Sequence, residues 1–419
     1  MQAQEQVRDF YQKLPYPPPV ADLEESRRLY ANPDRVRALL RLLWPVGTPR
    51  ADRKILIAGC GTSQAIRYAL REPLTHITAI DISAESLERA RALQNQYDLQ
   101  NLEFHQLSIL DVPKLGESFD QIVCTGVLHH LADSDAGLRC LRDVLAAEGA
   151  MQIMVYAAYG RTGIYMMQDY CRLLGITPSE QELDDLSAAL SYMPADHPLS
   201  WLRHKTKDFN SPDGLADVLL NPCDRAYTVP QVQGWLERCG MSFGRWFEQA
   251  PYLPQCGALA KSPHAQRLAS LPEPVQHAAV ELFRGTITQH NFIAYRADRP
   301  CQSQPVRFGD DQWRRYVPIR LPWALCVREG TPAGAVLLNP AHKHAEFAWP
   351  ISRQESDLLS LVDGTRTLDE IANSARNVPT EAVRDFFEKL WRYDQLVFDT
   401  GPDRLPVADH MGRKPDAPD

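Results

Sequence analysis

The chain has 419 residues, of which 44% are hydrophobic and 23% are charged. This composition is typical of a globular protein, and the length predicts two domains. The net charge is -8 and no long Lys/Arg run occurs, which argues against a sequence-independent nucleic-acid binder. No stretch approaches the roughly 20 apolar residues of a membrane helix, and the charged N-terminus does not resemble a signal peptide. We therefore expect a soluble, cytoplasmic protein with no membrane partner.

The nine cysteines are scattered along the chain, and no two of them form a Cys-x-x-Cys pair. This spacing predicts buried, reduced thiols rather than a disulfide framework or a zinc site. The histidines and carboxylates do not fall into metal-ligand spacing either. The sequence therefore predicts no metal centre.

Strands alternating with helices are predicted from residue 51 onward, after a helical N-terminal segment over residues 1–50 that is broken by prolines. A long insertion over residues 157–227 interrupts the alternation. Such alternation predicts an α/β fold with a doubly wound parallel sheet and helices on both faces. Seven strands are expected, at residues 54–58, 76–80, 102–106, 119–124, 150–156, 241–248 and 291–296.

The segment Ile-Ala-Gly-Cys-Gly-Thr-Ser at residues 57–63 follows the first predicted strand and precedes a predicted helix. Its glycines let the backbone turn sharply and approach a ligand closely. Asp81 ends the next predicted strand, about 20 residues on, where a carboxylate accepts hydrogen bonds from both hydroxyls of a ribose. Together these features predict a nucleotide-like ligand at this edge of the sheet.

At this point the sequence resembles the class I, Rossmann-like methyltransferases that use S-adenosylmethionine. The resemblance covers roughly residues 50–296 and rests on residues 57–63, on AIDIS at 79–83 and on FDQIVCTGVLHHL at 119–131. A nicotinamide dehydrogenase, the main competitor, would show G-x-G-x-x-G/A, whereas Gln64 stands at the third position here. The resemblance implies S-adenosylmethionine as cofactor, with these contacts: Gly59, Cys60, Gly61, Thr62, Asp81, Ile82, Ser108, Ile109 and Thr125, and Tyr11 and Tyr16 from an N-terminal lid. Ser108 replaces the acidic residue that contacts adenine in many relatives.

The methyl acceptor is expected next to the loop after the fourth strand, because the resemblance implies that the methyl group faces this loop. The catalytic candidates are His129, His130 and Tyr159, since an imidazole has a suitable pKa for a general base. A structural role in capping and packing the following helix is the alternative for the two histidines. The insertion is the expected pocket wall, with Tyr156, Arg161, Tyr165, Asp169 and Tyr227 as substrate-binding candidates.

A second, smaller unit is predicted at residues 311–400, after the methyltransferase domain at 51–299 and a polar linker. Three short helices followed by a strand outline a winged-helix-like α+β domain. Its third helix, near residues 381–392, carries balanced charge, which favours a protein contact or a homodimer over DNA. Residues 401–419 are expected to be a disordered tail.

Three functions remain open from the sequence. The first is methyl transfer to a small-molecule acceptor. The second is methylation of a protein or peptide that the C-terminal domain holds. The third is a non-catalytic regulator that binds S-adenosylmethionine. No motif specifies the acceptor atom, and the fold alone does not choose among these functions.

Overall fold

The computed structural model describes residues 2–14, 23–46, 49–50, 52–299, 306–328, 334–342, 344–375 and 378–401. The predicted lid residue Tyr16 and the tail beyond residue 401 lie outside these ranges. Within them, every helix is too short or too polar to span a lipid bilayer.

The central sheet has the predicted seven long strands, in the order β3-β2-β1-β4-β5-β8-β7. The first five are parallel, whereas β8 runs antiparallel to both β5 and β7. A short eighth strand, β6 (Ala226–Tyr227), pairs with the end of β5. The long strands are β1 (Lys54–Ala58), β2 (His76–Asp81), β3 (Leu102–Gln106), β4 (Phe119–Thr125), β5 (Leu145–Ala157), β7 (Met241–Trp246) and β8 (Gln289–Arg296). The prediction of a seven-stranded doubly wound sheet is confirmed.

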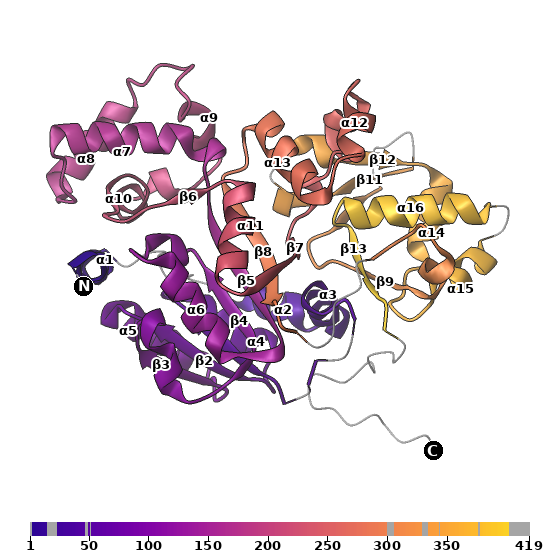
Figure 1. Cartoon of the computed structure of the whole chain (residues 1–419), viewed down its shortest axis with the longest axis horizontal. Coiled ribbons are helices and arrows are strands. Elements are labelled where there is room, and N and C mark those ends of the chain that lie inside the picture. The colour runs from indigo at the N-terminus through magenta and orange to yellow at the C-terminus, as the bar shows by residue number, and fades with distance from the viewer. Residues whose placement is uncertain are drawn as a thin grey trace.

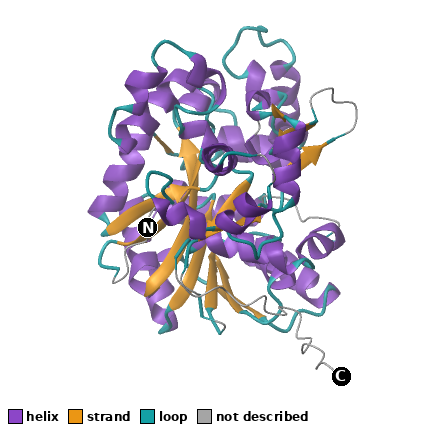
Figure 2. Cartoon of the chain, turned by 90° about the vertical axis from the view of Figure 1, so that its right-hand side faces the viewer, coloured by secondary structure: helices purple, strands orange, loops and turns teal. Residues whose placement is uncertain are grey.

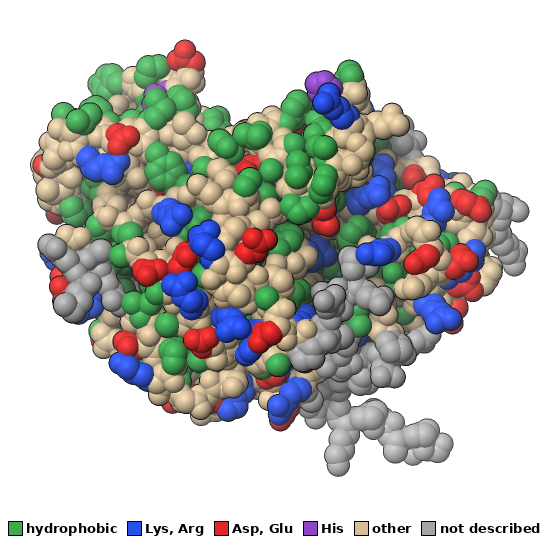
Figure 3. Space-filling model, in the orientation of Figure 1, with side chains coloured by type: hydrophobic (Ala, Val, Ile, Leu, Met, Phe, Trp, Pro, Cys, Tyr) green, Lys and Arg blue, Asp and Glu red, His purple; other side chains and the backbone are tan. Residues whose placement is uncertain are grey.

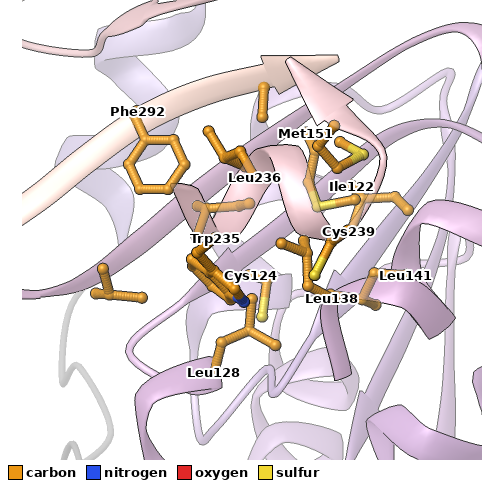
Figure 4. Close-up of a cluster of buried hydrophobic side chains, with 14 of the residues drawn as sticks. Ile122, Cys124, Leu128, Leu138, Leu141, Met151, Trp235, Leu236, Cys239 and Phe292 are labelled. Atoms are coloured by element: carbon orange, nitrogen blue, oxygen red, sulfur yellow. The ribbon is translucent and has the colours of Figure 1, made fainter. Parts of the chain in front are cut away.

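Helices cover both faces of this sheet, as Figure 2 shows for the strands enclosed by helices. The central strands read as apolar runs because both of their faces are buried. On one face, Trp235 and Leu236 pack on Cys124, Met151 and Phe292 of three neighbouring strands (Figure 4). The helices of the sheet are α4 (Gln64–Arg71), α5 (Ala84–Gln96), α6 (Ser134–Val144), α11 (Val229–Arg238), α12 (Ala265–Ala269) and α13 (Glu273–Arg284).

The insertion forms a helical lobe at the carboxyl end of the sheet, at the upper left in Figure 1. It contains α7 (Thr162–Leu174), α8 (Glu180–Leu190), α9 (Ser200–Arg203) and α10 (Pro212–Leu220). The N-terminal helix α1 (Gln2–Lys13) adds Phe10 to the apolar core of this lobe. Helices α7 and α10 therefore share an apolar cluster with the N-terminal helix, and its role as a lid stays a prediction.

The C-terminal unit shows the predicted order of three helices and a strand: α14 (Arg353–Ser360), α15 (Leu368–Ser374), α16 (Thr380–Arg392) and β13 (Leu396–Asp399). Capping boxes begin α14 at Ser352 and α15 at Thr367. Strand β13 pairs with β9 (Val317–Arg320), and a second sheet joins β10 (Leu325–Val327), β11 (Ala335–Leu338) and β12 (Trp349–Ile351). The assignment of this unit as a winged helix stays a prediction.

Buried ion pairs attach the C-terminal unit to the rest of the molecule. Arg41 of α3 (Pro33–Leu43) lies 2.7 Å from Asp399, and both side chains are almost fully buried. Helix α2 (Glu24–Tyr30) precedes α3 and contacts it and α4. Arg245 of β7 lies 3.1 Å from Asp394, which also accepts a hydrogen bond from the Ala250 N–H at 2.9 Å. Residues of the C-terminal unit are thereby fixed in place beside the sheet.

Candidate active site

A cavity of about 720 Å³ lies at the carboxyl ends of the parallel strands, where ligands bind in open α/β sheets. Its wall combines the loops after β1 to β4, helix α1, the insertion, residues 286–291 and the C-terminal unit. Figure 3 shows a notch in the surface between the lobe of the insertion and the region of α12 and α13. We call the part of the cavity lined by the loops after β1, β2 and β3 the donor half, and the remainder the acceptor half.

The turns of the donor half explain why glycines occur in the first motif. Gly59 has φ +73° and Gly61 has φ +54°, a left-handed conformation that side chains disfavour. A Cβ on Gly59 would also lie 2.3 Å from Cγ2 of Val127. The segment between β1 and α4 therefore approaches the loop after β4 closely only because this position is glycine.

Asp81 connects the first two turns of the donor half. One of its carboxylate oxygens accepts a hydrogen bond from the Gly61 N–H, and the other accepts one from the Ser83 N–H, both at 2.9 Å. Burial raises the pKa of Asp81, and the backbone N–H groups of Ser83 and Gly61 oppose this shift. Each oxygen keeps a further lone pair, so the carboxylate is suited to accept hydrogen bonds from two vicinal hydroxyls.

Most of the predicted cofactor contacts line the cavity. Ser108, whose hydroxyl accepts a hydrogen bond from the Leu110 N–H at 3.2 Å, faces it beside the apolar Ile82, Leu107 and Ile109. Thr62 is buried outside the cavity lining. The predicted residues that line the cavity are Gly59, Cys60, Gly61, Asp81, Ile82, Ser108, Ile109, Thr125 and Tyr11.

Of the two adjacent histidines, His130 is the one that lines the acceptor half. Its Nδ1 lies 2.7 Å from the Cys223 carbonyl oxygen. Because a carbonyl oxygen only accepts, Nδ1 carries the proton and a neutral ring keeps a lone pair on Nε2. The ring packs edge-on against Tyr11 and Tyr156, with centroids at 6.1 and 5.7 Å. His130 is therefore placed to accept a proton or a hydrogen bond.

His129 lies behind this wall, with its ring centroid 4.1 Å from that of His130 and 4.0 Å from that of Tyr156. It is fully buried, and burial holds its pKa well below the usual range, so the ring is neutral. This geometry favours the structural alternative for His129. Nitrogen atoms of both histidines and the Asp224 carboxylate lie within 4.8 Å of one another. Arg161, 3.4 Å from Asp224, already supplies a cation there, so we assign no metal to the group.

Arg161 and Tyr156 are the two predicted substrate-binding residues that lie together in the acceptor half. The Arg161 guanidinium lies 3.4 Å from the centroid of the Tyr156 ring, and both residues line the cavity. Burial raises the pKa of Tyr156 well above its ordinary value, so its hydroxyl keeps its proton. The protonated phenol offers a hydrogen-bond donor to a substrate, while Arg161 and His129 pack on its ring.

Four other predicted residues lie outside the cavity lining as it is described. Tyr165 contacts Asp224, and Asp169 pairs with Arg172 at the surface. The buried Tyr227 stacks on Trp235 and donates a hydrogen bond to Ser134. Tyr159 is 40% exposed on the short turn before α7. Their catalytic and substrate-binding roles stay predictions that the geometry does not favour.

Several residues of the acceptor half were not predicted. Asp217 lies on α10 among Leu215, Ala216 and Val218, and an acidic residue on an apolar helix face is the signal that marks it. No comparable signal marks the others, because they come from loops far apart in the sequence. They include Lys205, Glu248, Tyr252, Thr288, Gln289, Asn291, His342 and His344.

Taken together, the fold and the donor half define a Rossmann-like site for a ribose-containing ligand. A model of the methyltransferase domain matches residues 56–151. An uncharacterized protein of a Synechococcus strain is 33% identical over 286 residues, which cover 66% of each chain. The chain spans 66% or less of the length of each of the first three curated relatives that it matches.

Two solved structures share the fold over most of the chain. PKMT2 from Rickettsia typhi has a TM-score of 0.65 at 16% identity, covering 92% of this chain and 77% of its own. The same protein in complex with AdoHcy has a TM-score of 0.61 at 15% identity, covering 88% and 76%. This chain belongs to the class I S-adenosylmethionine-dependent methyltransferases.

S-adenosylmethionine is accordingly the cofactor, and the donor half fits it. The Asp81 carboxylate has lone pairs for the two ribose hydroxyls, and Gly59 and Gly61 admit the ligand close to the backbone. Ile82 and Ile109 line the same half and would provide apolar surface for the flat adenine ring.

Proposed function

We propose that this chain transfers the methyl group of S-adenosylmethionine to a small-molecule acceptor bound in the acceptor half. The observation that carries the proposal is the continuous cavity that joins Asp81 to Tyr156 and on to Tyr252. Its volume of about 720 Å³ lies in the range of about 300–1,000 Å³ found for small-molecule sites. A donor together with an acceptor of modest size suits such a space.

The bound cofactor supplies an electrophilic methyl carbon, and the residues of the chain hold the acceptor in line with it. Holding two reactants in a reactive geometry removes much of the entropic barrier of a bimolecular step. Trp201 and Tyr252 give the acceptor half aromatic walls. Arg161 adds hydrogen-bond donors, and His130 adds a hydrogen-bond acceptor. Helix α1, which carries Tyr11 over the cavity, excludes water from the reacting groups.

Methylation of a protein or peptide is the second candidate. It is favoured by the contribution of the C-terminal unit, since His342 and His344 reach the same cavity as Tyr156. A side chain of a macromolecule that entered between the insertion and this unit would meet residues of both. A non-catalytic sensor of S-adenosylmethionine is the third candidate, which requires donor binding without product formation.

Donor titration followed by a labelling experiment tests these functions. Calorimetry should give micromolar binding of S-adenosylmethionine and of S-adenosylhomocysteine. The pure protein is then incubated with methyl-labelled donor and with extract separated by ultrafiltration into small-molecule and macromolecular fractions. Label transferred only in the small-molecule fraction supports the proposal, and label on protein supports the second candidate. Donor binding without transfer to either fraction would leave the sensor, and absent donor binding would overturn all three.

A cytoplasmic location and a homodimer through the C-terminal unit stay predictions from the sequence. Light scattering of the purified chain measures its mass in solution. A mass of 47.4 kDa, that of a single chain, would contradict the homodimer.

A further inference from the structure

Asp217 brings a carboxylate into the acceptor half. It lies on the apolar helix α10, its side chain lines the cavity, and the residue is only 4% exposed. Buried carboxylates are rare unless their oxygens are paired or serve a function. Each of the two carboxylate oxygens of Asp217 is therefore expected to have a partner or a function.

One oxygen has a structural partner. Oδ1 accepts a hydrogen bond of 2.8 Å from the hydroxyl of Tyr11, and that hydroxyl accepts one of 3.0 Å from the Asn221 amide. These contacts hold the N-terminal helix against α10. Oδ2 has no hydrogen-bond partner among the residues that the structure describes. The hydrogen bond between the Tyr11 hydroxyl and Asp217, which we call the clasp, therefore occupies Oδ1 and leaves Oδ2.

Residues of the N-terminal helix, the loop after β4 and the insertion act electrostatically on Asp217. Tyr11, which binds Asp217, is also the residue whose ring packs against His130. Burial raises the pKa of Asp217, while His130, the Tyr11 hydroxyl and Arg161 lower it and Asp208 raises it. A carboxylate whose proton affinity is raised by burial is suited to take up a proton during a reaction.

We propose that Asp217 is a catalytic residue whose Oδ2 accepts the proton of the acceptor group. The acceptor atom attacks the methyl carbon, the electron pair of the broken S–C bond returns to sulfur, and the proton of the acceptor atom moves to Oδ2. The products are the methylated acceptor, S-adenosylhomocysteine and a protonated carboxyl group. This inference rests on the proposed function and adds that the nucleophile carries a hydrogen.

Binding of a donor analogue tests the position of the carboxylate without any acceptor. Sinefungin carries an amine where S-adenosylmethionine carries its methyl group, whereas S-adenosylhomocysteine carries nothing there. A carboxylate that faces the ammonium attracts it, so Asp217→Asn should weaken sinefungin roughly tenfold relative to S-adenosylhomocysteine. The asparagine still accepts the hydrogen bond of Tyr11, so the clasp is kept.

Tyr11→Phe is the complementary control, because it breaks the hydrogen bond that Asp217→Asn keeps and leaves the carboxylate. It should shift the affinities for the two analogues by equal factors. An unchanged ratio of affinities in Asp217→Asn, or an equal change of the ratio in both variants, would overturn the proposal. If the wild-type protein binds neither analogue, the proposed function is contradicted instead, and the role of Asp217 that rests on it falls with it.

Turnover supplies the second measurement once the labelled acceptor is known. Asp217→Asn should lower kcat at least tenfold with the donor KM little changed, as expected for a group that acts in the transition state. Tyr11→Phe should mainly raise the donor KM. Equal kcat values for Asp217→Asn and wild type would overturn the catalytic role even if the binding result held.

Discussion

The two halves of the cavity are built in different ways. The donor half comes from residues 59–63, 81–86 and 107–110, which the parallel strands β1 to β3 deliver to one edge of the sheet. The acceptor half collects residues from the N-terminal helix, the insertion, the β8 region and the C-terminal unit. One half is thus a property of local strand–turn–helix units, and the other is a property of how distant segments pack.

The carboxylates of the two halves show the same contrast. Both oxygens of Asp81 accept backbone N–H bonds from turns that the sheet fixes. Asp217 is bonded by a side chain that arrives from the other end of the sequence. Substitutions in the segments that pack around the sheet should therefore alter the acceptor half before the donor half.

The largest effect is expected from the attachment of the C-terminal unit. Asp399→Ala leaves the buried guanidinium of Arg41 without its carboxylate, which should lower the free energy of unfolding by about 3–5 kcal/mol. Chemical denaturation monitored by fluorescence measures this. Asp52→Ala, in an exposed pair with Arg50, is the control and should leave the free energy of unfolding nearly unchanged. Similar losses in both variants would show that the buried pair does not anchor the unit.

The donor half should respond most strongly to Asp81. Asp81→Ala removes the acceptor for the ribose hydroxyls and for the N–H groups of Gly61 and Ser83. Since hydrogen bonds to a charged group contribute about 1.5–3 kcal/mol, we expect donor affinity to fall roughly 100-fold in calorimetry. Asp81→Asn, which keeps one acceptor oxygen, should fall less. Unchanged affinity in Asp81→Ala would contradict the assignment of the donor half.

The free energy of unfolding should depend on pH through His277, which is buried. This residue accepts a hydrogen bond from the Trp246 indole at 3.0 Å, and burial lowers its pKa to about 4. The unfolded chain binds the proton near pH 6.5, so the stabilisation is complete above that pH and is lost as pH falls toward 4. We expect about 2 kcal/mol less stability at pH 5 than at pH 7.5 from this residue.

Denaturant unfolding of wild type and His277→Gln at both pH values measures this contribution. His344, whose pKa burial also lowers to about 4, adds a loss of the same sign in both proteins. The variant should therefore retain part of the acid destabilisation and lack the part due to His277. An identical difference between the two pH values in both proteins would contradict the assignment.

The contrast between the halves also explains what could be predicted from the sequence. Gly59, Gly61 and Asp81 are recognisable because each follows a predicted strand at a fixed spacing, and parallel strands bring such positions together. Nothing local relates Asp217 to Tyr11, 206 residues earlier, since their contact depends on how α1 packs on the insertion. Tyr227 is predicted at the pocket because it is an aromatic residue at the end of the insertion, yet its hydroxyl donates its hydrogen bond to Ser134.

The same limit applies to the two histidines. Residues 129 and 130 are equivalent in the sequence, and the turn after β4 decides which of them meets the cavity. In the C-terminal unit the order of three helices and a strand is predictable from the sequence pattern, and capping boxes at Ser352 and Thr367 begin two of these helices. His342 lines the cavity and contacts Asp394, which also pairs with Arg245, and the sequence alone does not relate these three residues.

The smallest effect, at Tyr11, bears on both halves at once. Tyr11→Phe removes one hydrogen bond to a carboxylate and leaves the ring, so it should cost about 1–2 kcal/mol in closing α1 over the cavity. If the helix closes after the donor binds, the cost appears in the donor dissociation rate, which should rise several-fold to tenfold in stopped-flow experiments. Ser83→Ala is the donor-side control, because its hydroxyl donates to the Tyr11 carbonyl at a longer 3.2 Å and also caps α5. A faster donor release in Ser83→Ala than in Tyr11→Phe would mean that the donor half, rather than the insertion, holds the lid. In that case closure of α1 would depend mainly on the donor half, and the hydrogen bond between Tyr11 and Asp217 would act only within the acceptor half.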